Sequence, residues 1–107
     1  MNVRGYAAQT SDSPLTPWTF ERRSPGENDV TIRIEHCGIC HSDIHFARNE
    51  WAFTKYPCVP GHEIVGRVEA VGRGVERYAK GDQVGVGCFV DSCRTCGSCK
   101  DGLENYC

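Results

Sequence analysis

The sequence predicts a mainly β fold, in which many short strands form a barrel or a sandwich. The first observation is composition: ten valines and five isoleucines stand against two leucines, and β-branched residues favour strands. The second observation is the frequency of turn residues: twelve glycines and recurrent turn signals divide the chain into short apolar segments. A length of 107 residues permits one small domain with a modest core.

The first strongly patterned segment is VTIRIE, residues 30–35, which alternates apolar and polar side chains after the turn signal SPGEND. Strict alternation predicts a strand with one buried face. Ser42 or Asp43 can then cap a short helix that runs to about Arg48. The motif HCGICHSDIH is therefore expected at the junction of a strand and a helix.

A second strand is predicted at residues 63–72, EIVGRVEAVG. Two prolines in the preceding YPCVPGHE keep the approach to this strand extended. Gly66, inside the strand, indicates a β-bulge or a close backbone approach. Residues 80–87, KGDQVGVG, predict a turn followed by another short strand.

The charge pattern argues against several classes of partner. The formal net charge is −2 with a sequence pI near 6.0, and lysine and arginine are scattered. This distribution disfavours a nucleic-acid or an acidic-membrane partner. No apolar run approaches the roughly 18 residues of a membrane span, and the stretch MNVRGYAAQT lacks the apolar region of a secretory signal. We therefore expect a cytoplasmic protein with no nucleic-acid or membrane partner.

Four of the eight cysteines are concentrated in the stretch SCRTCGSCKDGLENYC. A C-x2-C-x2-C-x7-C loop can wrap round one ion, and four thiolates in a tetrahedron are a typical structural zinc site. The loop has too few apolar residues to fold by burial alone. The predicted ligands of this structural zinc are Cys93, Cys96, Cys99 and Cys107.

Two alternatives for this cysteine group are an iron–sulfur cluster and a disulfide framework. The bacterial iron–sulfur pattern continues with x3-C-P, whereas here the fourth cysteine comes after seven residues and no proline follows it. In a reducing cytosol, closely spaced thiols bind metal more often than they form disulfides. Both considerations favour zinc.

A second group of metal-binding side chains lies in CHSDIH and GHE, residues 40–45 and 61–63. One thiolate, one imidazole and an adjacent carboxylate form a mixed ligand set, which is expected where zinc keeps a position open for substrate. Each residue alone also has an ordinary explanation, as a small buried cysteine or as a surface His–Glu pair. Cys37, Cys58 and Cys88 belong to neither group, and we expect them to be buried as small apolar side chains.

Three motifs in this order resemble the N-terminal, GroES-like portion of zinc-dependent medium-chain alcohol dehydrogenases, over nearly all 107 residues. GHEIVGRVEAVGRGV matches the signature G-H-E-x2-G-x5-G-x2-V, and the terminal cysteines match the structural-zinc loop. GICHSD followed by YPCVPGHE is most similar to the cinnamyl alcohol dehydrogenase branch. The resemblance implies a GroES-like partial β-barrel over residues 1–107, with short helices and a structural-zinc lobe at residues 91–107.

The resemblance also implies a role for each residue of the mixed ligand set. Cys40, and not Cys37, matches the thiolate ligand of a catalytic zinc. His62 matches the imidazole ligand, and Glu63 matches a carboxylate that ligates the metal or lies just behind it. Asp43 matches the acid that orients the ligand histidine, a role that would fix the ring tautomer.

Further implied roles concern proton transfer, cofactor and substrate. Ser42 matches the hydroxyl that takes the substrate alcohol's proton, and His45 matches the histidine that receives it through the cofactor ribose. His41 would face the cofactor phosphates. Trp51 and Phe53 would line an apolar substrate pocket, unless they are ordinary core aromatics. The implied reaction is NADP(H)-linked oxidation of a small alcohol or reduction of an aldehyde, with zinc as Lewis acid.

The sequence departs from intact members of the family in two respects. It lacks the downstream cysteine that completes the catalytic site, and GRGVER, its nearest approach to G-x-G-x-x-G, lacks the third glycine. We therefore expect an N-terminal fragment without a Rossmann domain, inactive by itself, with NADP bound only when the missing domain is present. Full-length members would form homo-oligomers. The alternative is a stand-alone zinc-binding module without catalysis.

Overall fold

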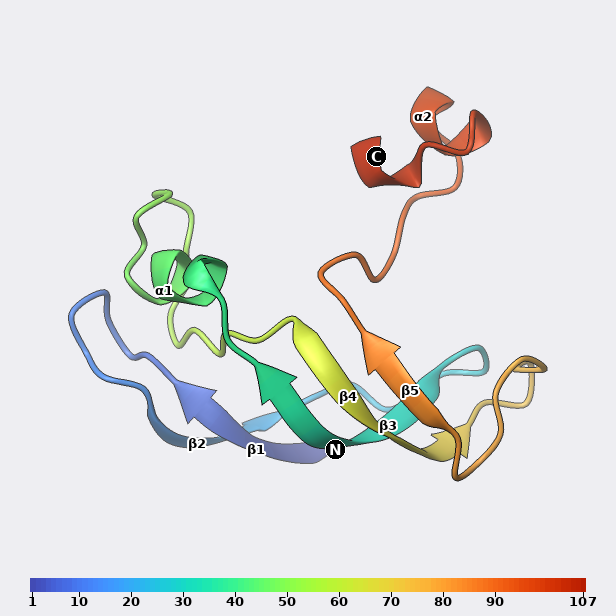
Figure 1. Cartoon of the computed structure of the whole chain (residues 1–107), viewed down its shortest axis with the longest axis horizontal. Coiled ribbons are helices and arrows are strands. Elements are labelled where there is room, and N and C mark those ends of the chain that lie inside the picture. Colours follow the sequence, from blue (N-terminus) through green and yellow to red (C-terminus); the bar gives the residue numbers. More distant parts are fainter.

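The computed structural model describes residues 1–107 and consists of two antiparallel sheets, short helices and a terminal lobe (Figure 1). One sheet pairs β1 with β2, and the other has the order β3-β4-β5. The elements in chain order are β1 (Asn2–Ala7), β2 (Thr16–Glu21), β3 (Val30–Gly38), α1 (His41–Ala47), β4 (Glu63–Val71), β5 (Gln83–Val86), α2 (Gly97–Lys100) and the 3-10 turn η1 (Glu104–Tyr106).

The pairing of β3 with β4 confirms the two strands that the sequence pattern predicts, and β5 confirms the short strand expected after them. The register of β3 against β4 shifts between Ile34 and His36, where Gly66 pairs with Ile34. A Cβ atom on Gly66 would lie 2.3 Å from the Arg33 carbonyl oxygen. Gly66 therefore permits a close backbone approach, as predicted.

Helix α1 confirms the predicted short helix, but the residue that caps it is not the expected one. Cys40 has the extended backbone of an N-cap, and its sulfur accepts a hydrogen bond from the Ser42 N–H at 3.3 Å. The Asp43 carboxylate in turn accepts from the Cys40 N–H at 2.9 Å. Ser42 and Asp43 therefore lie within the first turn of the helix, and the expectation that one of them is the cap is wrong.

The β1–β2 hairpin has no counterpart among the predicted strands. Most side chains of β2 are exposed, and its alternation of apolar and polar residues is limited to residues 18–21, after Pro17. Just beyond β1, Ala8 and Cys58 exchange two backbone hydrogen bonds of 2.9 Å. This bridge ties the hairpin to the segment that leads into β4, and Ala7 and Ala8 are fully buried beside it.

The molecule is open rather than closely packed. Its radius of gyration is 15.8 Å, whereas a compact domain of this length has about 13 Å. Ala7, Ala8 and Val68 are the buried apolar residues, and many large apolar side chains are partly exposed. The two sheets do not close, which agrees with the expected partial barrel. None of the helices is long and apolar enough to span a membrane.

Residues 91–107 form a lobe that stands clear of both sheets (Figure 1). The lobe contains α2 and η1, neither of which has a buried residue. Its hydrogen bonds are internal: the Leu103 N–H donates to Ser98 at 2.8 Å, and the Cys107 N–H donates to Glu104 at 3.0 Å. Packing against the sheets therefore contributes little to the structure of the lobe.

Candidate metal centres

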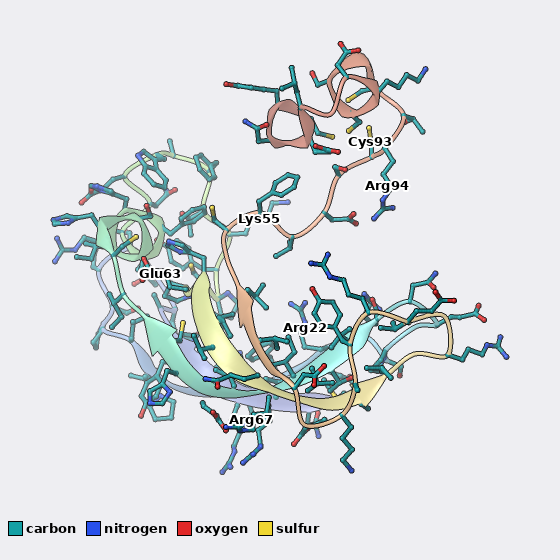
Figure 2. The ribbon with its side chains drawn as sticks, turned by 45° about the vertical axis from the view of Figure 1, so that its right-hand side comes forward. Arg22, Lys55, Glu63, Arg67, Cys93 and Arg94 are labelled. Carbon is teal, nitrogen blue, oxygen red and sulfur yellow. The ribbon has the colours of Figure 1, made fainter.

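Two groups of donor atoms occur in separate parts of the molecule. Figure 2 shows Glu63 at the start of β4, beside α1, and Cys93 in the distant lobe. We call the group near α1 the mixed centre and the group in the lobe the thiolate centre. In each group the candidate ligand atoms all lie within 4.8 Å of one another. The mixed centre consists of Cys40, His62 and Glu63, and the thiolate centre of Cys93, Cys96, Cys99 and Cys107.

The mixed centre brings together residues from two elements that are adjacent in the sheet. Cys40 lies between β3 and α1, where the helix cap fixes its backbone. His62 immediately precedes β4, the strand that pairs with β3. The Cys40 sulfur and the His62 Nε2 atom are 3.2 Å apart. Sequence spacing alone does not bring these residues together, because 22 positions separate them.

Asp43 links the two halves of the mixed centre. One carboxylate oxygen accepts the Cys40 N–H at 2.9 Å, and the other lies 3.3 Å from the His62 Nδ1 atom. The Asp43 side chain is only 8% exposed, so both contacts are shielded from water. A proton on Nδ1, the nitrogen beside the Asp43 carboxylate, leaves the Nε2 lone pair of His62 to face the Cys40 sulfur. The resemblance predicted the contact to His62, but not the contact to Cys40.

Two glycines shape the backbone around Glu63 and His62. Gly38 pairs with Glu63 in the register of β3 and β4, and a Cβ atom there would lie 2.4 Å from a Glu63 carboxylate oxygen. Gly61 has φ of 131° and lies against Cys37, whose sulfur would be 2.8 Å from an added Cβ. A side chain at either position would displace its neighbour. Sequence reasoning missed Gly38, because its position opposite Glu63 follows from the pairing of β3 with β4 and has no local signal.

The donor geometry of both groups fits a tetrahedral zinc ion. Ligand distances of about 2.3 Å for sulfur and 2.0–2.1 Å for nitrogen place a thiolate and an imidazole about 3.5 Å apart, and two thiolates about 3.8 Å apart. The Cys40–His62 distance is 3.2 Å, and the Cys93 and Cys99 sulfurs are 3.9 Å apart. The mixed centre offers three protein donors, as open catalytic sites do, whereas the thiolate centre offers four.

Within the thiolate centre, hydrogen bonds favour the anionic form of one cysteine. The Cys93 sulfur accepts from the Thr95 hydroxyl at 3.5 Å, from the Thr95 N–H at 3.5 Å and from the Cys96 N–H at 3.3 Å. These donors, the Thr95 hydroxyl first, lower the pKa of Cys93 to about 5. A thiolate is the form that binds metal, so the lobe backbone already favours the ligand state.

An open cavity of about 720 Å³ adjoins the mixed centre. Ser42 and His62 line it together with aromatic side chains that follow α1. Trp51 stacks on Phe53 with ring centroids 6.0 Å apart, and Phe46 meets both rings edge to face. The cavity therefore combines an apolar wall with a hydroxyl and the metal donors.

His41 and His45 do not line this cavity; His41 is exposed and His45 is half-buried. The Nδ1 atom of His45 pairs with the Glu50 carboxylate. No hydrogen bond joins His45 to Ser42. The structure therefore does not bring the predicted relay residues into direct contact, and their role stays a prediction.

The cysteines outside both centres are less buried than expected. Cys37 and Cys88 are exposed, and Cys58 is half-buried, so the expectation of burial is wrong for the first two. The reason is the open barrel, which leaves these positions without covering side chains. Burial, with a smaller effect of the Asp43 charge, raises the pKa of Cys58, which keeps that thiol protonated.

The mixed centre has three donors beside a cavity, as catalytic zinc sites do. The thiolate centre has four cysteines, as closed structural zinc sites do. Residues 26–107 match the family described as alcohol dehydrogenase GroES-like domain. The chain belongs to this family.

Curated relatives support the assignment. Over 107 residues the chain is 62% identical to the aldehyde reductase YahK of Escherichia coli K12, covering 100% of this chain and 31% of the relative. It is 58% identical to cinnamyl alcohol dehydrogenase 2 of Rauvolfia serpentina, covering 96% of this chain and 29% of that protein. The chain thus spans about 30% of the length of these relatives, which are named as dehydrogenases or reductases.

Solved structures show the same fold. A cinnamyl alcohol dehydrogenase of Sorghum bicolor superposes with a TM-score of 0.96 at 53% identity, covering 100% of this chain and 30% of that one. The cinnamyl alcohol dehydrogenase of Helicobacter pylori complexed with NADP(H) superposes with a TM-score of 0.94 at 48% identity, covering 100% of this chain and 31% of that one. The predicted family and the GroES-like fold are both confirmed.

Proposed function

We propose that this chain supplies the zinc-binding and substrate-facing part of an NADP(H)-linked alcohol dehydrogenase that also reduces aldehydes. The observation that carries the proposal is the meeting of Cys40, His62 and Glu63 beside a cavity with apolar walls. Residues 1–107 would form the GroES-like domain, and residues 91–107 its structural-zinc lobe. The donor geometry and the named dehydrogenase relatives support this assignment.

In this proposal, different residues of the chain bind the metal, exchange a proton with the substrate oxygen and contact the carbon part of the substrate. A zinc ion held by the mixed centre would supply Lewis acidity to an alcohol or aldehyde oxygen. Asp43 keeps the His62 ring oriented, since it holds the Nδ1 side. Ser42 lines the cavity, where its hydroxyl can exchange a proton with the substrate oxygen. Trp51 and Phe53 contact the carbon part of the substrate and exclude water.

The cofactor would be NADP(H), which supplies the hydride and would be held largely by sequence that the relatives have outside the matched region. The printed names of two relatives support NADP: one structure is an NADP(H) complex, and one curated relative is an NADP-dependent alcohol dehydrogenase. His41, exposed at the start of α1, would face the cofactor phosphates, and His45 would receive the proton from Ser42 through the ribose. We further propose a cytoplasmic enzyme that forms homo-oligomers at full length.

A second candidate function is a zinc-binding module without catalysis. The separate lobe favours it, because the lobe has its own donors and stands clear of the sheets. The mixed centre argues against it, since a closed structural site requires neither an open ligand position nor a hydroxyl in an adjacent cavity.

A chimera tests the proposed function. The matching part of the E. coli aldehyde reductase, which is 62% identical to this chain, is replaced by residues 1–107, and NADPH-linked aldehyde reduction is measured. We expect activity in the chimera and none in the 107-residue chain alone, which does not hold the hydride donor in line with the substrate. Cys40→Ala should abolish the activity of the chimera, and Cys37→Ala should retain it. A folded, zinc-loaded chimera without activity, or equal losses in both variants, would contradict the proposal.

A further inference from the structure

Helix α1 carries two histidines one turn apart that do not line the cavity beside the mixed centre. His41 is the first residue of the helix and is exposed, and His45 follows four positions later with its side chain 35% exposed. Side chains at positions i and i+4 are neighbours on a helix surface. The two ring centroids are 6.1 Å apart, with an angle of 38° between the ring planes. This pair lies outside the mixed centre, whose histidine ligand is His62.

The second observation is the position of Glu50. Its carboxylate pairs with the Nδ1 atom of His45, and its backbone N–H donates to the His45 carbonyl at 3.0 Å. A carboxylate on Nδ1 fixes the tautomer and leaves the Nε2 lone pair free, which is the usual arrangement behind a metal-binding histidine. Asp43 and His62 show the same arrangement in the mixed centre.

We propose that His41 and His45 form a third metal site, which binds a divalent transition-metal cation through two imidazole nitrogens. Two ligand bonds of about 2.0–2.1 Å place the nitrogens about 3.4 Å apart on a tetrahedral ion. Rings whose centroids are 6.1 Å apart do not reach that separation as they stand, and a small rotation of the exposed His41 side chain toward His45 closes the gap. Imidazole pairs without thiolate select Ni²⁺, Cu²⁺ and Zn²⁺ over Mg²⁺ and Ca²⁺. Water would fill the remaining positions of the ion.

The site has a consequence that rests on the proposed function. If His45 receives a proton during the reaction, a cation on its Nε2 atom removes the lone pair that accepts it. Excess Ni²⁺ or Zn²⁺ would then inhibit the enzyme without displacing the zinc of the mixed centre. The binding itself does not depend on catalysis and can be measured on this chain.

Trp51 provides a direct probe of the site, because its ring centroid lies 5.1 Å from that of His45. The chain is first loaded with zinc at both centres, and Ni²⁺ is then added while tryptophan fluorescence is recorded. We expect saturable quenching with no release of zinc. His41→Gln and His45→Gln should each weaken the apparent affinity at least tenfold, and Glu50→Gln should weaken it by about tenfold. Trp51→Phe should remove the quenching, because the other tryptophan, Trp18, lies in β2.

His36→Gln is the matched control, since His36 is an exposed histidine on β3, away from α1. It should bind Ni²⁺ as the unmodified chain does. The proposal is overturned if the unmodified chain shows no saturable quenching, if His36→Gln is weakened as much as His41→Gln, or if Mg²⁺ quenches equally. Zinc content and far-ultraviolet circular dichroism, measured on each variant, separate loss of the site from loss of the fold. The aldehyde reductase activity of the chimera without Ni²⁺ tests the proposed function independently.

Discussion

The thiolate centre and the mixed centre contain similar candidate ligands, but the chain brings them together in different ways. All four cysteines of the thiolate centre lie within residues 93–107, on a lobe whose hydrogen bonds are internal. The mixed centre combines Cys40 with a histidine 22 positions away, and requires the β3–β4 pairing to bring them together. Sequence spacing alone therefore brings the cysteines of the thiolate centre together, whereas the residues of the mixed centre meet only when the sheet has formed.

The two centres also differ in what holds them before metal binds. In the mixed centre, the buried Asp43 carboxylate contacts both the Cys40 backbone and the His62 ring. The elements of the thiolate centre, α2 and η1, contain no residue that is buried as a whole. The lobe should therefore depend on metal for its structure, whereas the mixed centre should keep its shape without metal.

The largest effect is expected from removing metal at the thiolate centre. Apparent binding free energies of structural zinc are about 10–16 kcal/mol, and in such sites this energy supplies the folding free energy. Cys96→Ser, or a strong chelator, should therefore unfold residues 91–107 while β3 and β4 keep their pairing. Hydrogen exchange measured by NMR would show loss of protection at the Leu103 N–H and retained protection in the sheet. Equal loss of protection in the lobe and in the sheet would show that the lobe does not depend on metal more than the sheet does.

A smaller effect is expected from Asp43→Asn at the mixed centre. Loss of the charged partner of a metal-binding histidine typically weakens metal affinity 10- to 100-fold. The thiolate centre should be unaffected, because it shares no contact with Asp43. Competition with a coloured chelator measures both affinities, and Asp12→Asn serves as an exposed control. An unchanged affinity in Asp43→Asn would show that the contacts of Asp43 are not needed for binding.

Gly66→Ala should destabilise the sheet without changing the lobe. The added Cβ would lie 2.3 Å from the Arg33 carbonyl oxygen, and such overpacking costs about 1–3 kcal/mol. Gly85→Ala is the matched control, because its Cβ would meet the nearest atom, the Ile64 carbonyl oxygen, at an ordinary 3.5 Å. Urea unfolding compares the two variants. Gly66→Ala should also weaken zinc binding at the mixed centre more than at the thiolate centre. Weaker zinc binding mainly at the thiolate centre would contradict the dependence of the mixed centre on the sheet.

The smallest effect concerns a surface pair remote from both centres. The Arg23 guanidinium, followed by the Gly26 N–H, lowers the pKa of Asp29 from 3.8 to about 2. Between these values the unfolded chain binds more protons than the folded one, so stability rises with pH across this window and the contribution is lost as pH falls toward 2. Arg23→Gln should weaken the dependence of folding stability on pH in this window, and Arg22→Gln should leave that dependence unchanged. Urea midpoints recorded from pH 2 to 5 provide the test.

The parts that the sequence predicts are those with a local signal. Alternation in VTIRIE identifies β3, and the repeated spacing of cysteines identifies the thiolate centre. The β1–β2 hairpin is not predicted, because the alternation in β2 is limited to residues 18–21 and Pro17 precedes it. Cys40 was missed as the helix cap because a sulfur acceptor is a weak capping signal compared with Ser42 or Asp43.

Contacts across the sheet cannot be predicted from a single sequence. The second contact of Asp43, to the Cys40 N–H, and the fit of Glu63 against Gly38 both depend on how β3 and α1 meet β4. Family resemblance supplied the pairing of Asp43 with His62, but it did not supply these details. The exposure of Cys37 likewise follows from the open barrel, and not from the preference of cysteine for buried positions.

We propose that this chain holds two independent zinc centres and that Cys40, not Cys37, belongs to the mixed centre. Zinc content combined with X-ray absorption at the zinc edge tests it most directly. The unmodified chain should bind two equivalents of zinc, one for each donor group. Cys40→Ala should retain one equivalent with four sulfur ligands at about 2.3 Å, and Cys37→Ala should retain both. A single equivalent in the unmodified chain, or loss of the mixed-ligand zinc in Cys37→Ala but not in Cys40→Ala, would contradict the account.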